Sequence, residues 1–196
     1  MKNKLLLALL LCCIKSFSQD SKFSVELSYP LPIDKNFIGH NYNGIVDLGI
    51  KYRFANLNSI SIGGSLNGGI FKNTKADAVQ PFDITAYAIQ PRIFAVLNSK
   101  SLQKFHPSIG LGYTFLMFKA KNIQTFNPEE PIIITSSASK NESGINLNLG
   151  TSYDITNKIF AIIQYDFIKI TVEDEVLDTK YNTNINIIKI GIGYRL

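Results

Sequence analysis

Apolar and polar residues alternate along most of this chain. In the clearest stretch, residues 46–54, every second residue is Val, Leu, Ile, Tyr or Phe, and the residues between them are small or charged. Successive side chains of a β-strand point to opposite faces, so this pattern predicts strands with one apolar and one polar face. Eight segments have the pattern, less regularly in the fourth and seventh: residues 23–29, 46–54, 60–70, 83–97, 105–117, 145–155, 158–171 and 188–196. The sequence therefore predicts an all-β fold.

The connections between the expected strands alternate in length. Short turns span residues 55–58, 98–103 and 156–158, and long polar links span residues 30–43, 72–82, 119–143 and 172–183. In a meander, alternate connections lie at opposite ends, so both termini fall beside the short turns. This predicts an eight-stranded antiparallel up-and-down transmembrane β-barrel with short periplasmic turns and long outer loops. We expect the longest link, which is rich in turn-forming residues, to be a loop.

The first 18 residues have the organisation of a secretory signal peptide. Two lysines precede the apolar residues 5–14, and a small-x-small site at residues 16–18 follows. This apolar stretch is too short to span a bilayer as a helix. We therefore expect residues 1–18 to be a signal peptide, cleaved between Ser18 and Gln19, and residues 19–196 to form one barrel domain. Lipid attachment at Cys13 is the alternative form of processing.

Removal of this segment changes what the composition allows. Both cysteines of the chain, Cys12 and Cys13, lie in it, so the expected mature protein has no disulfide, no thiolate nucleophile and no cysteine metal site. The formal net charge falls from +5 to +2, because residues 1–18 contain three lysines and no acid. No basic stripe with interleaved aromatic residues remains, and we therefore expect no nucleic acid as a partner.

Alternation alone also fits a soluble periplasmic barrel that turns its apolar face inward around an apolar ligand. Three features favour the membrane. The polar faces are rich in Gly and Ser, which suits a crowded interior. Several apolar faces are long enough for the lipid band. Aromatic residues near the expected strand ends suit the girdles of a membrane barrel: Tyr29, Tyr42, Tyr52, Phe54, Phe71, Phe105, Phe118 and Tyr194.

Three stretches of sequence carry a resemblance to a known family: residues 107–113 (PSIGLGY), 147–155 (LNLGTSYDI) and 190–196 (IGIGYRL). Residues 19–196 resemble the porin-like family of small bacterial outer-membrane β-barrel proteins. The resemblance implies location in the outer membrane of a Gram-negative bacterium, contact with outer-membrane lipid, and a C-terminal strand that the outer-membrane assembly machinery reads. That family ends on an aromatic residue, whereas this chain ends on Leu196.

The polar faces carry ten ionisable or amide side chains that would share the barrel interior. Buried charges must be paired or hydrated, and eight strands leave an interior that side chains can fill. We therefore expect this lumen polar cluster to plug the barrel; a narrow gated water path lined by the same residues is the alternative. The ten residues are Glu26, Asp47, Lys51, Arg53, Gln90, Arg92, Gln164, Asp166, Lys189 and Arg195.

Few residues of the chain are candidates for catalysis or metal binding. His106 and Ser108 share a strand face and could form a nucleophilic pair, but they follow a short turn and face inward, whereas lipid deacylases with a His-x-Ser pair place it towards the lipid. His40 is expected in a solvated loop. The acidic residues 173–175 and Asp178 lack the glycine turn of a calcium loop. We expect no enzyme activity, no cofactor and no metal.

Four functions remain open at this point. The first is a structural or surface-binding barrel whose long loops contact an extracellular ligand, with residues 30–43 and 119–143 as the best candidates. The second is a narrow porin or transport module for small or amphipathic solutes. The third is the soluble barrel with an apolar ligand. The fourth is an enzyme acting on outer-membrane lipid through His106 or Ser108.

Overall fold

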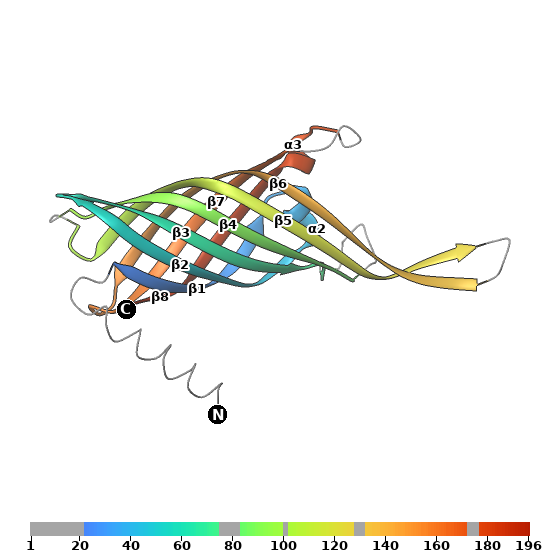
Figure 1. Ribbon diagram of the computed structural model, residues 1–196, viewed down its shortest axis with the longest axis horizontal. Helices are drawn as coiled ribbons and strands as arrows, with labels where there is room; N and C mark the ends of the chain where they lie inside the picture. Colours follow the sequence, from blue (N-terminus) through green and yellow to red (C-terminus); the bar gives the residue numbers. More distant parts are fainter. Residues whose placement is uncertain (1–21, 75–82, 100–101, 128–131, 172–176) are drawn as a thin grey trace, which may run out of the picture.

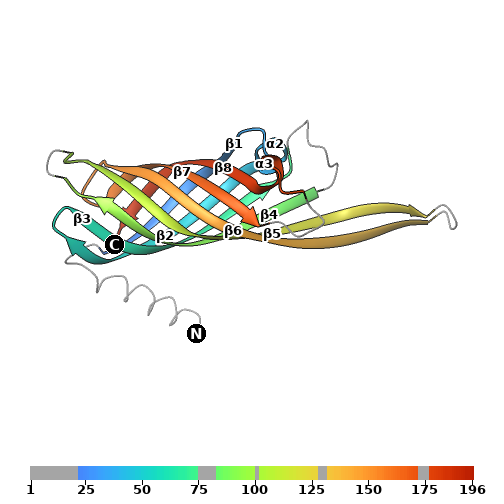
Figure 2. The same ribbon diagram turned by 90° about the horizontal axis from the view of Figure 1, so that it is seen from above.

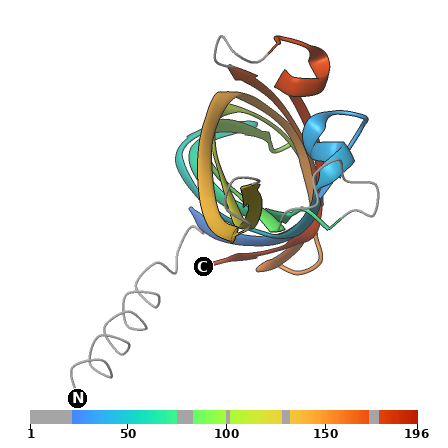
Figure 3. The same ribbon diagram turned by 90° about the vertical axis from the view of Figure 1, so that its right-hand side faces the viewer.

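The computed structural model describes residues 22–74, 83–99, 102–127, 132–171 and 177–196, which form a closed barrel (Figures 1 and 3). Each strand pairs antiparallel with the next, and the last pairs with the first. The predicted eight-stranded up-and-down barrel is confirmed. Its strands are β1 (Phe23–Ile33), β2 (Asn43–Leu57), β3 (Ile60–Lys72), β4 (Asp83–Leu97), β5 (Phe105–Asn127), β6 (Ile132–Asp154), β7 (Ile159–Thr171) and β8 (Asn184–Arg195).

The two ends of the barrel differ, as the alternating connections predict (Figures 1 and 2). At one end, here called the turn end, lie the connections β2–β3, β4–β5 and β6–β7, together with the start of β1 and the end of β8. At the other, the loop end, lie the helices α2 (Phe37–Asn41) and α3 (Lys180–Thr183) and the far part of β5 and β6. No helix in the described ranges is long and apolar enough to cross a bilayer.

The expectation of a loop over residues 119–143 is wrong. β5 continues to Asn127 and β6 begins at Ile132, and the two strands stay paired as far as Asn127 and Ile132. The resulting hairpin projects beyond the rest of the barrel (Figures 1 and 2). Pro, Ser and Glu in this stretch suggested turns, but two strands can pair through their backbones with little regard to composition, because every non-proline residue carries a backbone donor and acceptor.

Two smaller boundaries also differ from the sequence prediction. The link over residues 30–43 is shorter than expected, because β1 runs to Ile33 and α2 occupies the middle of the link. The turn expected at residues 55–58 lies at Asn58 and Ser59. A register shift between Arg53 and Ala55 breaks the alternation, so the sequence pattern ends before the strand does.

The outer surface of the barrel is an apolar belt to which every strand contributes. On each strand the apolar face of the alternation points outward, and large side chains there are about half exposed or more: Leu27, Leu48, Leu66, Ile93, Leu111, Ile145, Ile163 and Ile190. A soluble barrel around an apolar ligand needs the opposite arrangement, because contiguous apolar surface of this kind requires lipid or a partner. The soluble-barrel alternative is therefore wrong.

Three of the eight expected girdle aromatics point inward instead. Phe71 and Tyr42 are buried, and Phe118 is partly buried against the interior. The alternation explains both strand residues, since Phe71 lies on the same face of β3 as the buried Asn67, and Phe118 on the same face of β5 as the buried Leu116. The other five aromatics are exposed on the outside: Tyr29, Tyr52, Phe54, Phe105 and Tyr194.

β7 shows how the barrel interior is layered. Both of its faces looked apolar in sequence, and its inward residues explain why: Phe160 and Ile162 lie towards the turn end, Gln164 and Asp166 in the middle, and Ile168 and Ile170 towards the loop end. The loop-end residues join an apolar layer made of Ile38, Tyr42, Phe71, Ile84, Ala86, Ala88, Leu116, Ile168, Ile170, Ile185 and Ile187. The interior thus changes from polar in the middle to apolar at the loop end.

Candidate functional site

The middle of the lumen is built around Asp166 of β7, which is fully buried. One of its carboxylate oxygens accepts a hydrogen bond from Arg92 Nη2 at 2.6 Å and lies 3.1 Å from Lys189 Nζ. The other oxygen accepts a hydrogen bond from Asn148 Nδ2 at 2.7 Å. Two cations and an amide surround the Asp166 carboxylate, so its buried charge is paired and hydrogen-bonded.

Lys189 of β8 extends this arrangement across the barrel. Its Nζ donates to Asp47 Oδ2 at 2.7 Å and to Gln90 Oε1 at 2.8 Å. Gln90 Oε1 also accepts from Arg92 Nη2 at 2.6 Å, and Asp47 accepts from Asn67 Nδ2 at 3.0 Å. Lys189 is 1% exposed and contacts two carboxylates and an amide oxygen. It therefore fills the lumen and links the strands around it.

Glu26 of β1 forms the side of the network nearer the turn end. Its carboxylate pairs with Lys51 Nζ at 2.8 Å and accepts a hydrogen bond from Gln164 Nε2 at 3.0 Å. Asn148 connects Gln164 to Asp166. The ionisable members of the central network are therefore three acids and three bases, so their formal charges cancel: Glu26, Asp47 and Asp166 with Lys51, Arg92 and Lys189.

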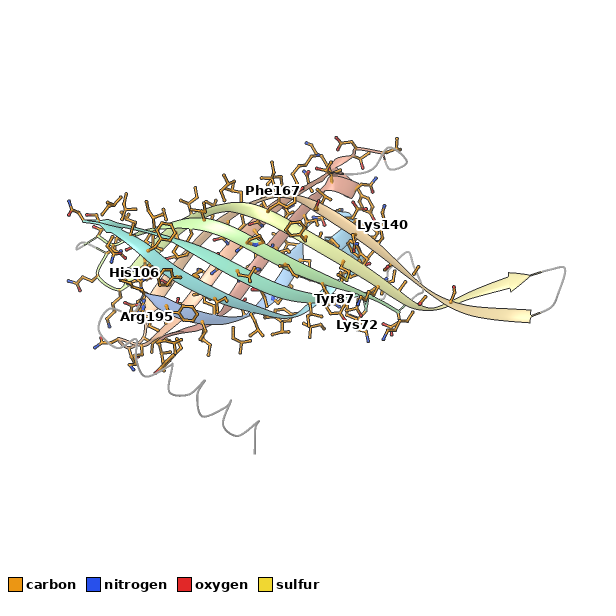
Figure 4. All side chains as sticks on the ribbon, in the orientation of Figure 1. Lys72, Tyr87, His106, Lys140, Phe167 and Arg195 are labelled. Carbon is orange, nitrogen blue, oxygen red and sulfur yellow. The ribbon has the colours of Figure 1, made fainter. Side chains whose placement is uncertain are left out.

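The remaining two residues of the predicted cluster lie at the turn end. Arg53 and Arg195 line a cavity of about 310 Å³ there, and Arg195 donates to Asp154. Arg195 also stacks over the Phe160 ring, with its guanidinium carbon 4.7 Å from the ring centroid. Figure 4 shows His106 and Arg195 at this end, and Lys72 and Lys140 towards the loop end. The structure thus places eight of the ten residues in one central network and two beside it.

His106 and Ser108 line the same turn-end cavity. His106 Nε2 lies 2.9 Å from Asp154 Oδ2, and His106 Nδ1 is buried with no hydrogen-bond partner in the structure. Neither ring nitrogen is hydrogen-bonded to the Ser108 hydroxyl, so the structure does not show the contact between nucleophile and base that a Ser–His pair uses.

Two short helices, α2 and α3, here called the cap, lie at one side of the loop-end rim (Figure 3), and Ile38 of α2 belongs to the apolar layer. Asn36 begins α2, with its Oδ1 accepting from Gly39 N at 2.7 Å and its Nδ2 donating to Ile33 O at 3.1 Å. α2 contacts α3 where the Phe37 and Tyr181 rings meet edge to face, 6.4 Å apart. Burial raises the pKa of the Tyr42 hydroxyl, directly after α2, to about 12.

The other residues considered in sequence have no common site. His40 lies in α2 and not in a loop, so that expectation is wrong. Residues 173–175 lie outside the described part of the chain, and Asp178 pairs with Lys169 Nζ at 3.0 Å. Among the residues that the structure describes, no three His, Cys, Asp or Glu side chains gather in a way that could hold a metal ion.

Sequence reasoning missed several members of the network. Asn67, Thr114 and Asn148 are buried and hydrogen-bonded to the ten predicted residues, and Asp154 joins His106 to Arg195. Their signal was present, because each lies on the polar face of an alternating segment. Asn67, Thr114 and Asn148 were left out because the prediction took only charged residues and glutamines, although asparagine and threonine bridge charges equally well inside a barrel. Asp154 was left out despite its charge.

Solved structures of bacterial barrels share this fold. Neisserial surface protein A is 14% identical with a TM-score of 0.60, over 89% of this chain and 97% of that one. A major outer membrane protein from Thermus thermophilus is 12% identical with a TM-score of 0.59, over 89% and 98%. Ail of Yersinia pestis, solved with the heparin analogue sucrose octasulfate, is 14% identical with a TM-score of 0.56, over 89% and 96%. No curated protein sequence matches the chain.

The comparison with protein families covers nearly the whole sequence. The family model described as "Outer membrane protein beta-barrel domain" matches residues 5–195. The closed eight-stranded barrel, its outward apolar belt and this match agree on an outer-membrane location in a Gram-negative bacterium. The chain belongs to the outer membrane protein beta-barrel domain family.

Proposed function

We propose that this protein is a sealed outer-membrane barrel that acts by binding at its loop end and does not pass solutes through its lumen. The observation that carries the proposal is that the lumen is filled twice, once by the central network and once by the apolar layer. In this proposal the chain performs no catalytic step, lipid surrounds the apolar belt, and the assembly machinery reads β8.

The central network supports a closed lumen because the charges at its centre are buried and paired. Asp47, Asp166 and Lys189 are each at most 1% exposed. Moving any one of them to open a water path would leave its partner as an unpaired charge in a low-dielectric interior, which costs several kcal/mol. A gated pore needs side chains that can change position at low cost, and these residues lack that freedom.

The apolar layer supports the same conclusion by different physics. Phe71, Leu116 and Ile168 meet inside the barrel between the network and the loop end. An ion that crosses this layer must shed its hydration without receiving polar ligands in return. Even if the network were to open, the layer would remain a barrier to charged solutes.

The loop end supports the binding role. The β5–β6 hairpin extends beyond the other strands, and α2 and α3 present further surface there. Leu177, beside α3, is 78% exposed, and Tyr181 is exposed as well. Recognition on barrels commonly uses connections held by a rigid scaffold, so this end is where we expect an extracellular ligand.

Single-channel recording in planar lipid bilayers tests whether the lumen is sealed. Insertion is first established by heat-modifiable gel mobility of the reconstituted mature chain. We expect no conductance steps from the wild-type protein. A variant that removes one acid, one base and two apolar residues, D166A/R92A/F71A/L116A, keeps the formal charge balance and should conduct. Reproducible steps from the wild type would contradict the proposal and favour the narrow transport module.

A further inference from the structure

A cavity of about 420 Å³ opens at the loop end, on the outer side of the apolar layer. Its walls come from α2, from β4, β5, β6 and β7, and from α3. Pockets that bind small molecules have volumes of about 300 to 1,000 Å³. The cavity therefore has the size for a small molecule.

Aromatic and aliphatic side chains make up most of its lining. Phe37, Tyr42 and Phe118 surround one side, with ring centroids 5.8 to 6.3 Å apart. Ile84 and Ile170 complete this apolar wall. Such a wall favours an apolar ligand, because burial of apolar surface is the main gain on binding and the rings already stand in fixed contact with one another.

The apolar layer lies between the cavity and the central network. Ile84 and Ile170 belong to the apolar layer, and the central network lies beyond that layer along β7. A molecule that enters from the loop end therefore stops there. The cavity is a binding site and not the entrance of a passage, and in this respect the inference rests on the sealed lumen of the proposed function.

The charges at the cavity identify the class of ligand further. The ionisable side chains of Lys140 and Glu142 line it, and they pair with one another at 2.8 Å. Because the formal charges of this pair cancel, a ligand with a charged group gains little net attraction from it. Ser139 and Asn182 also line the cavity and can hydrogen-bond a hydroxyl or carbonyl group.

We propose that this loop-end cavity binds a small uncharged molecule that is mainly apolar and carries at most a hydroxyl or carbonyl group. The aromatic wall holds the apolar part, and the paired Lys140 and Glu142 select against ions. The cavity is the ligand site of the loop end, and the hairpin beside it supplies its outer wall through β5 and β6.

The chain contains no tryptophan, which makes a direct test possible. The variant F118W carries the only tryptophan of the chain in the cavity, and F37W is a second reporter on α2. Each is reconstituted in phosphatidylcholine vesicles and titrated with a bromine-labelled medium-chain alcohol, which quenches tryptophan on contact. We expect saturable quenching for both reporters. The matched control F115W lies on the outward face of β5 and should show only gradual quenching, as the alcohol partitions into lipid.

A blocking variant and charged probes complete the experiment. A138F added to F118W fills the cavity and should weaken saturable binding at least about tenfold, with heat-modifiable mobility retained. The corresponding carboxylate and amine should bind up to about fivefold more weakly than the alcohol, because each gains little net attraction from the partly exposed ion pair. Quenching that is gradual in both reporters, or unchanged by A138F, would overturn the proposal. Tighter binding of either charged probe would overturn the selection for an uncharged ligand.

The outcome is independent of the conductance measurement. A barrel that conducts but shows saturable quenching would lose the proposed sealed function and keep the ligand site. A barrel that stays closed and shows only gradual quenching would keep the sealed function and lose the ligand site.

Discussion

The central network and the apolar layer fill successive levels of the same lumen, from neighbouring inward positions of the same strands. The network fills its level with paired charges, and the layer fills its level with apolar side chains. On β7, Asp166 is held by charges from two other strands, whereas Ile168, two residues further along, only packs against apolar side chains. Both are completely buried. The network depends on matched charge and the layer depends on matched volume. The first should therefore fail when a partner is removed, and the second when a methyl group is removed.

The largest effect should come from breaking the charge match. D166A leaves Arg92 buried with Gln90 but no acid, so we expect a loss of about 3 to 5 kcal/mol in the free energy of unfolding. Urea unfolding in phospholipid vesicles, followed by heat-modifiable mobility, measures it. D166A/R92A removes the unpaired charge and should recover much of the loss. The control K72A breaks a half-exposed pair and should cost under about 1 kcal/mol. A cost for D166A as small as that of K72A would contradict the charge-matched network.

A smaller loss should follow from removing volume in the apolar layer. I168A opens a cavity, and we expect about 2 to 3 kcal/mol, the lower part of the usual range, because α2 can settle into part of the space. The same unfolding assay measures it. The control I163A lies on the outward face of β7, where Ile163 is half exposed, so it should cost clearly less. Equal losses for the two variants would argue against a well-packed layer.

A third variant separates the cap from the barrel beneath it. N36A removes the side chain that begins α2, where Asn36 is 3% exposed, and caps of this kind contribute about 1 kcal/mol. Hydrogen exchange of the α2 amides should become faster, while amides in the middle of β7 stay protected. The control T179A removes the exposed cap of α3 and should leave α2 unchanged. Faster exchange throughout the barrel in N36A would mean that cap and barrel unfold together.

The smallest effect should be the response of the exposed loop-end pair to pH. The hydrogen bond and charge of Lys169 lower the pKa of the Asp178 carboxyl below its usual value of 3.8. The stabilisation from this pair is present above that unfolded-state value and is lost as the pH falls through the lower folded-state pKa. Amide exchange in α3 should therefore become faster, relative to D178N, only in that acidic range. An identical pH response in D178N would show that the pair contributes nothing to α3.

The alternation of the sequence predicted the barrel, its outward belt and the inward placement of residues such as Asp47 and Lys189. It also contained the inward placement of Phe71 and Phe118, which lie on the polar faces of their strands and were assigned to the girdle from residue type and nearness to a strand end, without regard to the face. Alternation tells which face a side chain takes but not its height in the barrel. The contact of Asp166 with Arg92 and Lys189 depends on how the strands are staggered around the ring, which a single sequence does not contain.

The hairpin and α2 were missed for a different reason. Residues 119–143 were assigned from turn-forming composition, but a long hairpin is stabilised by backbone pairing that composition does not record. α2 is only five residues long, too short for a helical repeat to be visible. Its place over the apolar layer comes from Ile38 and Tyr42, whose tertiary contacts set their role.

The length of the β5–β6 hairpin also determines how far from the bilayer another molecule can contact this protein. β5 pairs with β4 as far as Lys121 and continues for six more residues to Asn127. At about 3.4 Å per residue, that is a reach of about 20 Å past the last β4–β5 pair. A large particle held away from the lipid headgroups by a coat of surface sugars could still meet the far part of the hairpin. Only a small molecule could penetrate the same coat to reach the cavity at its base.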